Sequence, residues 1–258
     1  MNLSVQYQKG DSKQVCSILK WLLSVSLLFV LSGCATTDQH PRDPLEPVNR
    51  VVYRFNEKAD VWVLKPVAET YHDYTPQPVR SGISNFFSNL GDASSAVNYS
   101  LQWQGEPAVY SMARFILNST VGILGFMDMT GENGHRRFPQ TGFGDTFARW
   151  GWKNSSYLVL PLLGPSTVRD GTGTVAGMAF QENVLYGQPH EDAMTLSNVV
   201  SGISHREKLL GIDETINEAA LDPYSYTRDV WLQSRARTTG DTLISPAEEK
   251  LDIDELMK

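Results

Sequence analysis

The chain has 258 residues and a formal net charge of −7 at pH 7. A negatively charged protein gains nothing from contact with phosphate backbones, so we do not expect a nucleic acid among its partners. The hydrophobic share of 41% suits a folded domain and is too low for a protein that crosses a membrane many times.

The first 33 residues predict a bacterial lipoprotein signal peptide. Lys13 and Lys20 accompany an apolar run at 18–31, which ends in Leu31-Ser32-Gly33-Cys34. The run is shorter than the roughly 20 residues that span hydrocarbon, although an N-terminal anchor that is never cleaved is the alternative. We expect Cys34 to carry a diacylglycerol thioether and an acyl chain such as palmitate, which would anchor the mature chain to a membrane. Cys16 leaves with the peptide, so no disulfide and no cysteine-based metal site is expected.

A polar tether at 34–42 leads to a predicted helix with two different faces. Asp43 is expected to cap this helix, with Pro44 at the first helical position and a kink or break at Lys65-Pro66. The apolar stripe consists of Leu45, Val48, Val52, Phe55, Ala59 and Trp62. The stripe beside it consists of Asn49, Tyr53, Asn56 and Asp60. Large side chains with polar tips are unusual on a face that only meets water.

Further helices are predicted on both sides of a glycine-rich centre at 121–144. The helical segments are 67–74, 79–101, 105–117, 166–180, 191–210, 213–221 and 222–237. The centre contains an exposed-looking apolar group, Ile123, Leu124, Phe126 and Met127. The apolar run 157–163 holds a proline and is expected to be an edge strand or an extended buried segment, after which Gly164-Pro165-Ser166 starts the next helix. Gly173 and Gly177 of that helix share a face and would allow close backbone approach.

We therefore expect a mainly α protein with one helical domain. The predicted divisions are a signal peptide at 1–33, a lipidated tether at 34–42, the helical domain at 43–237 and an acidic tail at 238–258. Because Trp and Tyr favour membrane interfaces, several of the amphipathic helices are candidates to lie in the plane of a membrane. In the alternative reading, the apolar stripes face the core of a soluble domain on a lipid tether.

Motifs for catalysis and cofactor binding are weak. The chain has no HExxH or GxSxG sequence. Gly171-Thr172-Gly173-Thr174-Val175-Ala176 matches a dinucleotide fingerprint, but no strand directly precedes it and no parallel sheet is predicted around it. We accordingly expect no enzyme activity, no cofactor and no metal.

Together the motifs resemble the MlaA/VacJ family of outer-membrane lipoproteins. In its first half the matching segments are Asp43-Pro44-Leu45-Glu46-Pro47-Val48-Asn49-Arg50, Tyr53-Arg54-Phe55-Asn56, Asn98-Tyr99, Gly105 and Arg114-Phe115-Ile116-Leu117-Asn118-Ser119. In its second half they are Phe143-Gly144-Asp145-Thr146, Trp150-Gly151, the run from Leu160 to Asp170, Asp222-Pro223-Tyr224 and Arg228-Asp229. They run in order from about residue 43 to 237, so the tail is not covered.

The resemblance implies a ring of amphipathic helices seated in the inner leaflet of the outer membrane of a Gram-negative bacterium, on the periplasmic side. A passage through the ring would remove mislocalised phospholipids from the outer leaflet and pass them to a periplasmic lipid-carrier protein, which maintains lipid asymmetry. It also implies association with a trimeric porin. An envelope scaffold without lipid passage is the alternative.

The residues expected at the passage or its gate are a guess from these patterns: Tyr53, Phe55, Asn56, Phe126, Leu160, Leu162 and Gly164. We expect Phe55 to bury its ring and Asn56 to bond a backbone group at the pore or to meet headgroups.

Overall fold

The computed structural model describes residues 40, 42–131, 138–181, 191–211 and 220–242. The predicted signal peptide, Cys34, the acidic tail from residue 243 and nearly all of the helix expected at 213–221 lie outside the described residues.

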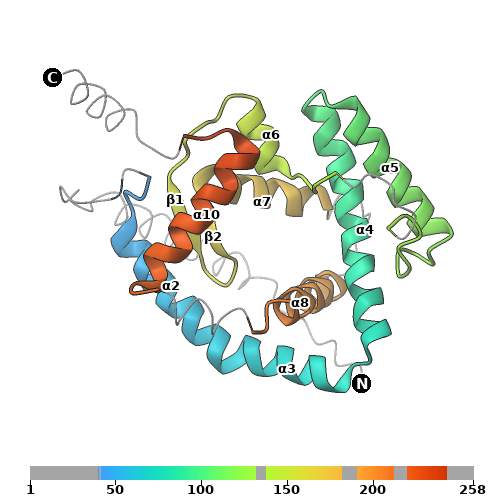
Figure 1. The fold of residues 1–258 in the computed structure, drawn as a ribbon, viewed down its shortest axis with the longest axis horizontal. Coiled ribbons are helices and arrows are strands. Elements are labelled where there is room, and N and C mark those ends of the chain that lie inside the picture. Colours follow the sequence, from blue (N-terminus) through green and yellow to red (C-terminus); the bar gives the residue numbers. More distant parts are fainter. Residues whose placement is uncertain (1–39, 41, 132–137, 182–190, 212–219, 243–258) are drawn as a thin grey trace, which may run out of the picture.

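The described elements follow one another around a central opening (Figure 1). They are α2 (Glu46–Ala59), the π-helix η1 (Asp60–Leu64), α3 (Lys65–Tyr74), α4 (Gln77–Leu101), α5 (Gly105–Thr120), α6 (Phe143–Arg149), β1 (Tyr157–Leu160), β2 (Gly164–Thr167), α7 (Val168–Phe180), α8 (Glu191–Glu207) and α10 (Pro223–Thr239). α2 to α3 form one long side of the ring, the α4–α5 hairpin forms the opposite side, and α10 returns beside α2. The prediction of a mainly α, ring-like bundle is confirmed.

The long side bends without breaking. η1 is a single wide turn, in which the backbone N–H of Lys65 donates to the carbonyl of Asp60, five residues earlier. Pro66 then sits at the start of α3, where a missing N–H is tolerated. Of the two outcomes expected at Lys65-Pro66, the structure has the kink.

Asp43 does not cap α2, so that prediction is wrong. The helix begins at Glu46, its N-cap residue is Leu45, and that position makes no side-chain capping hydrogen bond. Asp43 is instead fully buried and bonds to side chains of α2 and α10. The Asp43 carboxylate points into the protein and not toward the first backbone N–H groups of α2, so it does not cap the helix.

The molecule buries polar side chains and exposes apolar ones. Among the described residues, 21 polar or charged side chains are buried against 10 hydrophobic ones, and half of those 10 are alanines. On the predicted apolar stripe of α2, Phe55 is 54% exposed and Trp62, in η1, is 81% exposed. The expectation that Phe55 buries its ring is therefore wrong. The polar stripe is the face of α2 that packs on the protein.

The α4–α5 hairpin follows the same rule. Its two helices are joined by polar contacts, because Arg114 of α5 donates to Asp92 of α4 at 3.1 Å and pairs with Asp128 in the following loop. Burial alone would raise the pKa of Asp128, but bonds from Thr130 and the charge of Arg114 outweigh it and lower that pKa to about 2. The predicted exposed group at Ile123, Leu124, Phe126 and Met127 is confirmed, with exposed fractions of 44–69%.

β1 and β2 form an antiparallel hairpin in which Tyr157 pairs with Thr167 and Leu160 with Gly164. This confirms the expected strand. Helix α7 begins only at Val168, because Gly164–Thr167 is the second strand and the Thr167 side chain caps the helix by accepting from the Asp170 N–H. The expected helix start at Gly164-Pro165-Ser166 is therefore too early.

Glycines bring α7 against α6, as predicted from their shared face. A Cβ atom on Gly173 would lie 2.3 Å from the backbone nitrogen of Gly144, so only glycine fits there. Gly177, one turn later, has its nearest neighbour at an ordinary 3.8 Å.

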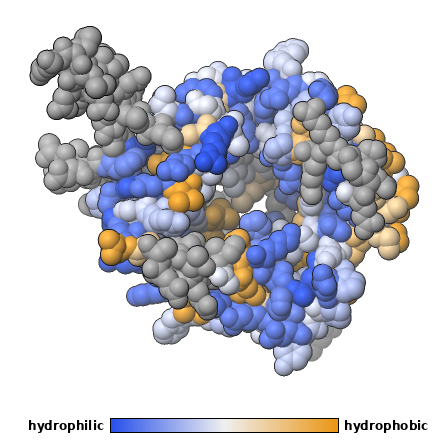
Figure 2. Space-filling model, in the orientation of Figure 1, coloured by the Kyte–Doolittle hydropathy of each residue, from blue (hydrophilic) through white to orange (hydrophobic). Residues whose placement is uncertain are grey.

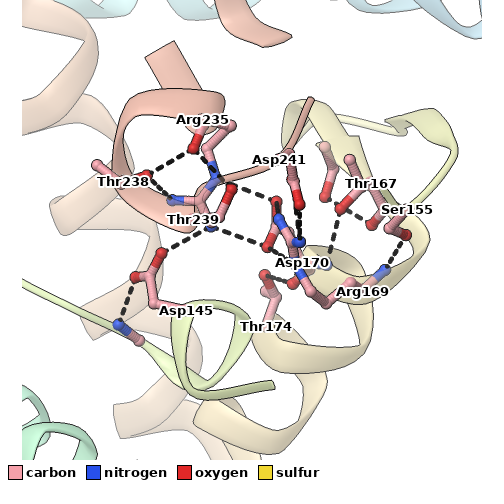
Figure 3. Close-up of polar contacts among 12 residues, drawn as sticks. Asp145, Ser155, Thr167, Arg169, Asp170, Thr174, Arg235, Thr238, Thr239 and Asp241 are labelled. Carbon is pink, nitrogen blue, oxygen red and sulfur yellow. Dashed lines mark hydrogen bonds and ion pairs between the residues drawn. The ribbon is translucent and has the colours of Figure 1, made fainter. Parts of the chain in front are cut away.

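Ion pairs join α6, α7 and α10 to the last described segment (Figure 3). Arg169 of α7 is fully buried and donates to both Asp241 oxygens, at 3.0 and 3.1 Å. Arg235 of α10 bonds Asp170 and pairs with Asp145 of α6 at 2.8 Å. Arg42 donates to the Thr242 carbonyl at 2.6 Å. These contacts hold α6, α7, α10 and the described residues that flank them, Arg42 and Asp241, together where the ring closes.

Candidate lipid passage

Two asparagines of α2 attach that helix to the backbone of β1 and its turn. The Asn49 amide donates to the Tyr157 carbonyl at 3.2 Å and accepts from the Val159 N–H at 2.9 Å. The Asn56 amide donates to the Leu160 carbonyl at 2.9 Å and accepts from the Leu162 N–H at 2.8 Å. Each amide therefore bonds the strand as a neighbouring strand would.

The spacing of the two amides fits the geometry of helix and strand. Seven residues of α-helix advance about 10.5 Å. The strand groups bonded by Asn56 lie three residues beyond those bonded by Asn49, and three strand residues advance about 10 Å. The two rises nearly match, so α2 and the strand run side by side with both amides satisfied.

A buried polar cluster at the start of α2 fixes the same helix to α10. One Asp43 oxygen accepts from the Asn49 amide at 2.8 Å, and the other accepts from the Tyr224 hydroxyl and from Arg228 at 3.3 Å. Burial, together with the bond to Asp43, raises the pKa of Tyr224. Because Asp43 bonds both Asn49 and α10, the position of α2 against the strand depends on this carboxylate.

Arg50 makes a second, more exposed link between α2 and α10. It donates to Asp222 at 2.7 Å and lies 4.4 Å from the centre of the Tyr224 ring. The hydrogen bond from Arg50 lowers the pKa of Asp222 to about 2. Tyr53 packs edge-on against Tyr224 at 5.5 Å, and burial raises its pKa.

The structure gathers some of the predicted site residues and separates others. Asn56, Leu160, Leu162 and Gly164 meet at the hairpin turn, where Leu162 is 62% exposed and both Leu162 and Gly164 have positive φ. Tyr53 lies on the same stripe of α2 as Asn56. Phe55 faces outward on that helix, and Phe126 packs on Phe86 of α4 at 5.9 Å, on the other side of the ring.

The sequence reasoning missed the partners of this cluster. Asn49 lay on the polar stripe and could have been paired with Asn56 by its seven-residue spacing. The sequence predicts a capping role for Asp43, and it offers Tyr224 and Arg228 only as residues of the family motifs. No local pattern shows that residues 43 and 228 meet.

The hairpin turn lies at the edge of the central opening (Figure 1). The space-filling view shows that this opening is bounded by hydrophilic and hydrophobic residues, and that hydrophobic residues cover the outer side of α5 (Figure 2). The α5 face contains Val109, Met112, Ile116 and Leu117, which are 41–69% exposed. None of the helices in the described part of the chain is long and apolar enough to cross a membrane. An apolar outer face on α5 beside a mixed opening suits lipid tails outside and a headgroup path inside.

Comparisons with known proteins agree with this arrangement. The sequence model of the family described as MlaA lipoprotein matches residues 41–238. The chain is 35% identical over 211 residues to the Escherichia coli K12 "Intermembrane phospholipid transport system lipoprotein MlaA", a match that covers 79% of this chain and 82% of the relative. It is 29% identical to the protein of the same description from Haemophilus influenzae, over 92% of this chain and 96% of that one.

A solved structure described as "Structural basis for maintenance of bacterial outer membrane lipid asymmetry" has the same fold. Its TM-score is 0.65 at 33% sequence identity, and the match covers 76% of this chain and 98% of the other. On the family match and these relatives, the chain belongs to the MlaA lipoprotein family.

Proposed function

We propose that this protein removes mislocalised phospholipids from the outer leaflet of the outer membrane and passes them to a periplasmic carrier, which maintains lipid asymmetry. The observation that carries the proposal is the inverted distribution of side chains. Polar groups hold the ring together from within, and large apolar side chains are exposed on α2, on η1 and on the outer side of α5, around a central opening. The descriptions of the relatives, which name intermembrane phospholipid transport, support the same role.

The protein is held on the periplasmic side of the outer membrane by lipid on Cys34. Ala35 follows this cysteine, in the place where an aspartate retains enterobacterial lipoproteins in the inner membrane, so outer-membrane sorting is expected. A trimeric porin holds the ring, and a soluble periplasmic lipid carrier accepts the lipid. No covalent bond is made or broken in this role, so the protein is a transport component and not an enzyme.

The gate of the passage is the hairpin turn together with Asn56. Gly164 and Leu162 adopt positive φ at this turn, and the Asn56 amide bonds the end of β1 and the turn residue Leu162. The exposed Leu162 side chain supplies an apolar contact for a passing acyl chain, and Tyr53 lies about one helical turn before Asn56 on α2.

The experiment is to remove the gene and measure phospholipid on the cell surface, then restore the wild-type chain or its Cys34→Ala variant. We expect surface phospholipid to rise on deletion and to return to normal only with the wild-type chain. An envelope scaffold without lipid passage predicts normal surface phospholipid in the deletion strain, with loss of a protein partner from the envelope instead.

A further inference from the structure

A polar pocket lies where the end of α3, the start of α4 and the end of α8 meet, at the corner of the ring away from the hairpin (Figure 1). Its volume is about 420 Å³, which is within the range of ordinary small-molecule sites. Its lining residues are His72, Gln77, Arg80, Ser81, Ser84, Asn85, Glu207 and Lys208.

The pocket carries an excess of positive charge in an acidic protein. Arg80 and Lys208 face a single carboxylate, Glu207, so one positive charge is left when His72 is neutral. Arg80 pairs with Glu207 through one guanidinium nitrogen and donates Nε to the Thr75 carbonyl at 3.0 Å. Its remaining nitrogen has no partner among the described residues. Lys208 bonds only the Ser84 hydroxyl and meets no carboxylate in the described part of the chain.

Neutral donors surround these cations. Gln77, Ser81 and Ser84 come from the first two turns of α4 and lie on the face of that helix that lines the pocket. α4 is 25 residues long, and no side chain bonds to its first turn, so the positive end of its dipole adds to the field of the two cations. The combination of two cations, hydroxyls and amides is typical of sites that bind phosphate oxygens.

Apolar side chains lie next to the pocket residues in the chain. Tyr74 is 85% exposed, Val79 is 46% exposed and Leu209 is 40% exposed. Inorganic phosphate has no carbon atoms to place on exposed apolar side chains, whereas a phospholipid has glycerol and acyl carbons.

We propose that this pocket binds the phosphodiester of a glycerophospholipid headgroup. A phosphodiester carries one negative charge, which balances the one positive charge in excess. The inference rests on the proposed function, since it places a second lipid contact on the ring, remote from the gate at Asn56. Inorganic phosphate offers the same oxygens and is the other source that the pocket would accept.

The test uses the full-length lipidated protein in a detergent without phosphorus. Dihexanoylphosphatidylglycerol, kept below its critical micelle concentration, is titrated and its binding followed by the ³¹P line width. Lys208→Gln removes one charged donor, and we expect it to weaken binding about tenfold. Lys208→Arg should restore binding. Lys58→Gln makes the same change of charge at an exposed site on α2 and should bind as the wild type does.

Equal binding by Lys208→Gln and Lys58→Gln would overturn the proposal, provided that both unfold at the wild-type temperature. Competition by an equal concentration of inorganic phosphate would assign the pocket to the free anion and overturn the headgroup assignment. Transfer of lipid from vesicles by the wild type is measured in parallel. Normal transfer without binding at the pocket would refute the pocket alone, and absent transfer would refute the proposed function.

Discussion

Asn49 and Asn56 show how a single side chain can replace a strand edge. An amide offers both a donor and an acceptor, so each asparagine satisfies one carbonyl and one N–H of the extended segment. A carboxylate at either place would accept from the N–H but would repel the carbonyl. The same two side chains therefore set the distance between α2 and the hairpin turn at the opening.

Replacement of Asn56 by alanine should change lipid flow in a protein that still folds. The substitution removes the amide partner of the Leu160 carbonyl and of the Leu162 N–H. Water can replace it at these partly exposed groups, so we expect a cost of about 0.5–1.5 kcal/mol in the free energy of unfolding. Surface phospholipid should change in either direction, because a loosened gate can also leak lipid the wrong way. The measurements are surface phospholipid, protein level and chemical unfolding in detergent.

Phe55→Ala, on the outward face of the same helix, is the comparison for Asn56→Ala. The ring is 54% exposed, so the loss of stability should be well below the roughly 3–5 kcal/mol of a fully buried phenylalanine. Unchanged surface lipid in every folded variant at Asn56 would refute the gate assignment and leave the family assignment intact.

Asp43→Ala should destabilise the protein far more than the loss of a helix cap. It removes the acceptor of the buried Tyr224 hydroxyl and one of the three carboxylates that Arg228 contacts, and breaking such a buried pair costs up to roughly 3–5 kcal/mol. Asp43→Asn keeps an acceptor for Asn49 and should be milder. A loss of about 1 kcal/mol for Asp43→Ala, measured by denaturant unfolding, would return this residue to a capping role.

The sequence predicts most of the helices but does not predict which face of α2 packs on the protein. The period of 3.6 residues divides α2 into two stripes, but it does not say which stripe faces the protein. That choice depends on the surroundings, since the proposed seating of the ring in lipid would remove the reason for apolar side chains to turn inward. The sequence predicts a buried Phe55 because apolar side chains avoid water, but its ring lies on the outward face of α2.

The contact between α6 and α7 allows a matched pair of substitutions on one helix. In Gly173→Ala the new methyl group meets the backbone of Gly144 and should destabilise the protein by about 1–3 kcal/mol. In Gly177→Ala the methyl group has room, and the better helix propensity of alanine should stabilise the protein by up to about 1 kcal/mol. Thermal unfolding of the two variants measures the difference. Equal shifts would contradict the close approach.

Buried arginine–aspartate ion pairs close the ring of helices. Arg42, Arg169 and Asp241 meet where the first and last described segments come together, so the ring is completed by buried ion pairs between residues up to 199 positions apart. The sequence contains these residues, but no local pattern pairs them, which is why the closure could not be predicted. The order of the helices and the strand β1 could be predicted, because each has its own periodicity and its own glycine or proline signals.

The membrane position of the molecule depends on the lipid anchor. Cys34→Ala should leave the precursor uncleaved and without acyl chains, since the modification needs the thiol. Fractionation of cells and the mass of the purified chain measure this. Mature-size protein on the outer membrane in that variant would contradict the lipoprotein assignment, and wild-type protein in the inner membrane would contradict the sorting expected from Ala35.

The proposed function is the passage of phospholipid through the ring. The most direct measurement places the full-length lipidated protein in bilayer nanodiscs that contain labelled phospholipid, adds a soluble periplasmic lipid carrier, and follows the label on the carrier. The proposed function predicts that the protein purifies with bound phospholipid and that transfer is faster than from protein-free nanodiscs. It also predicts a changed rate for Asn56→Ala. Transfer no faster than from protein-free nanodiscs, by protein that holds no phospholipid, would contradict it.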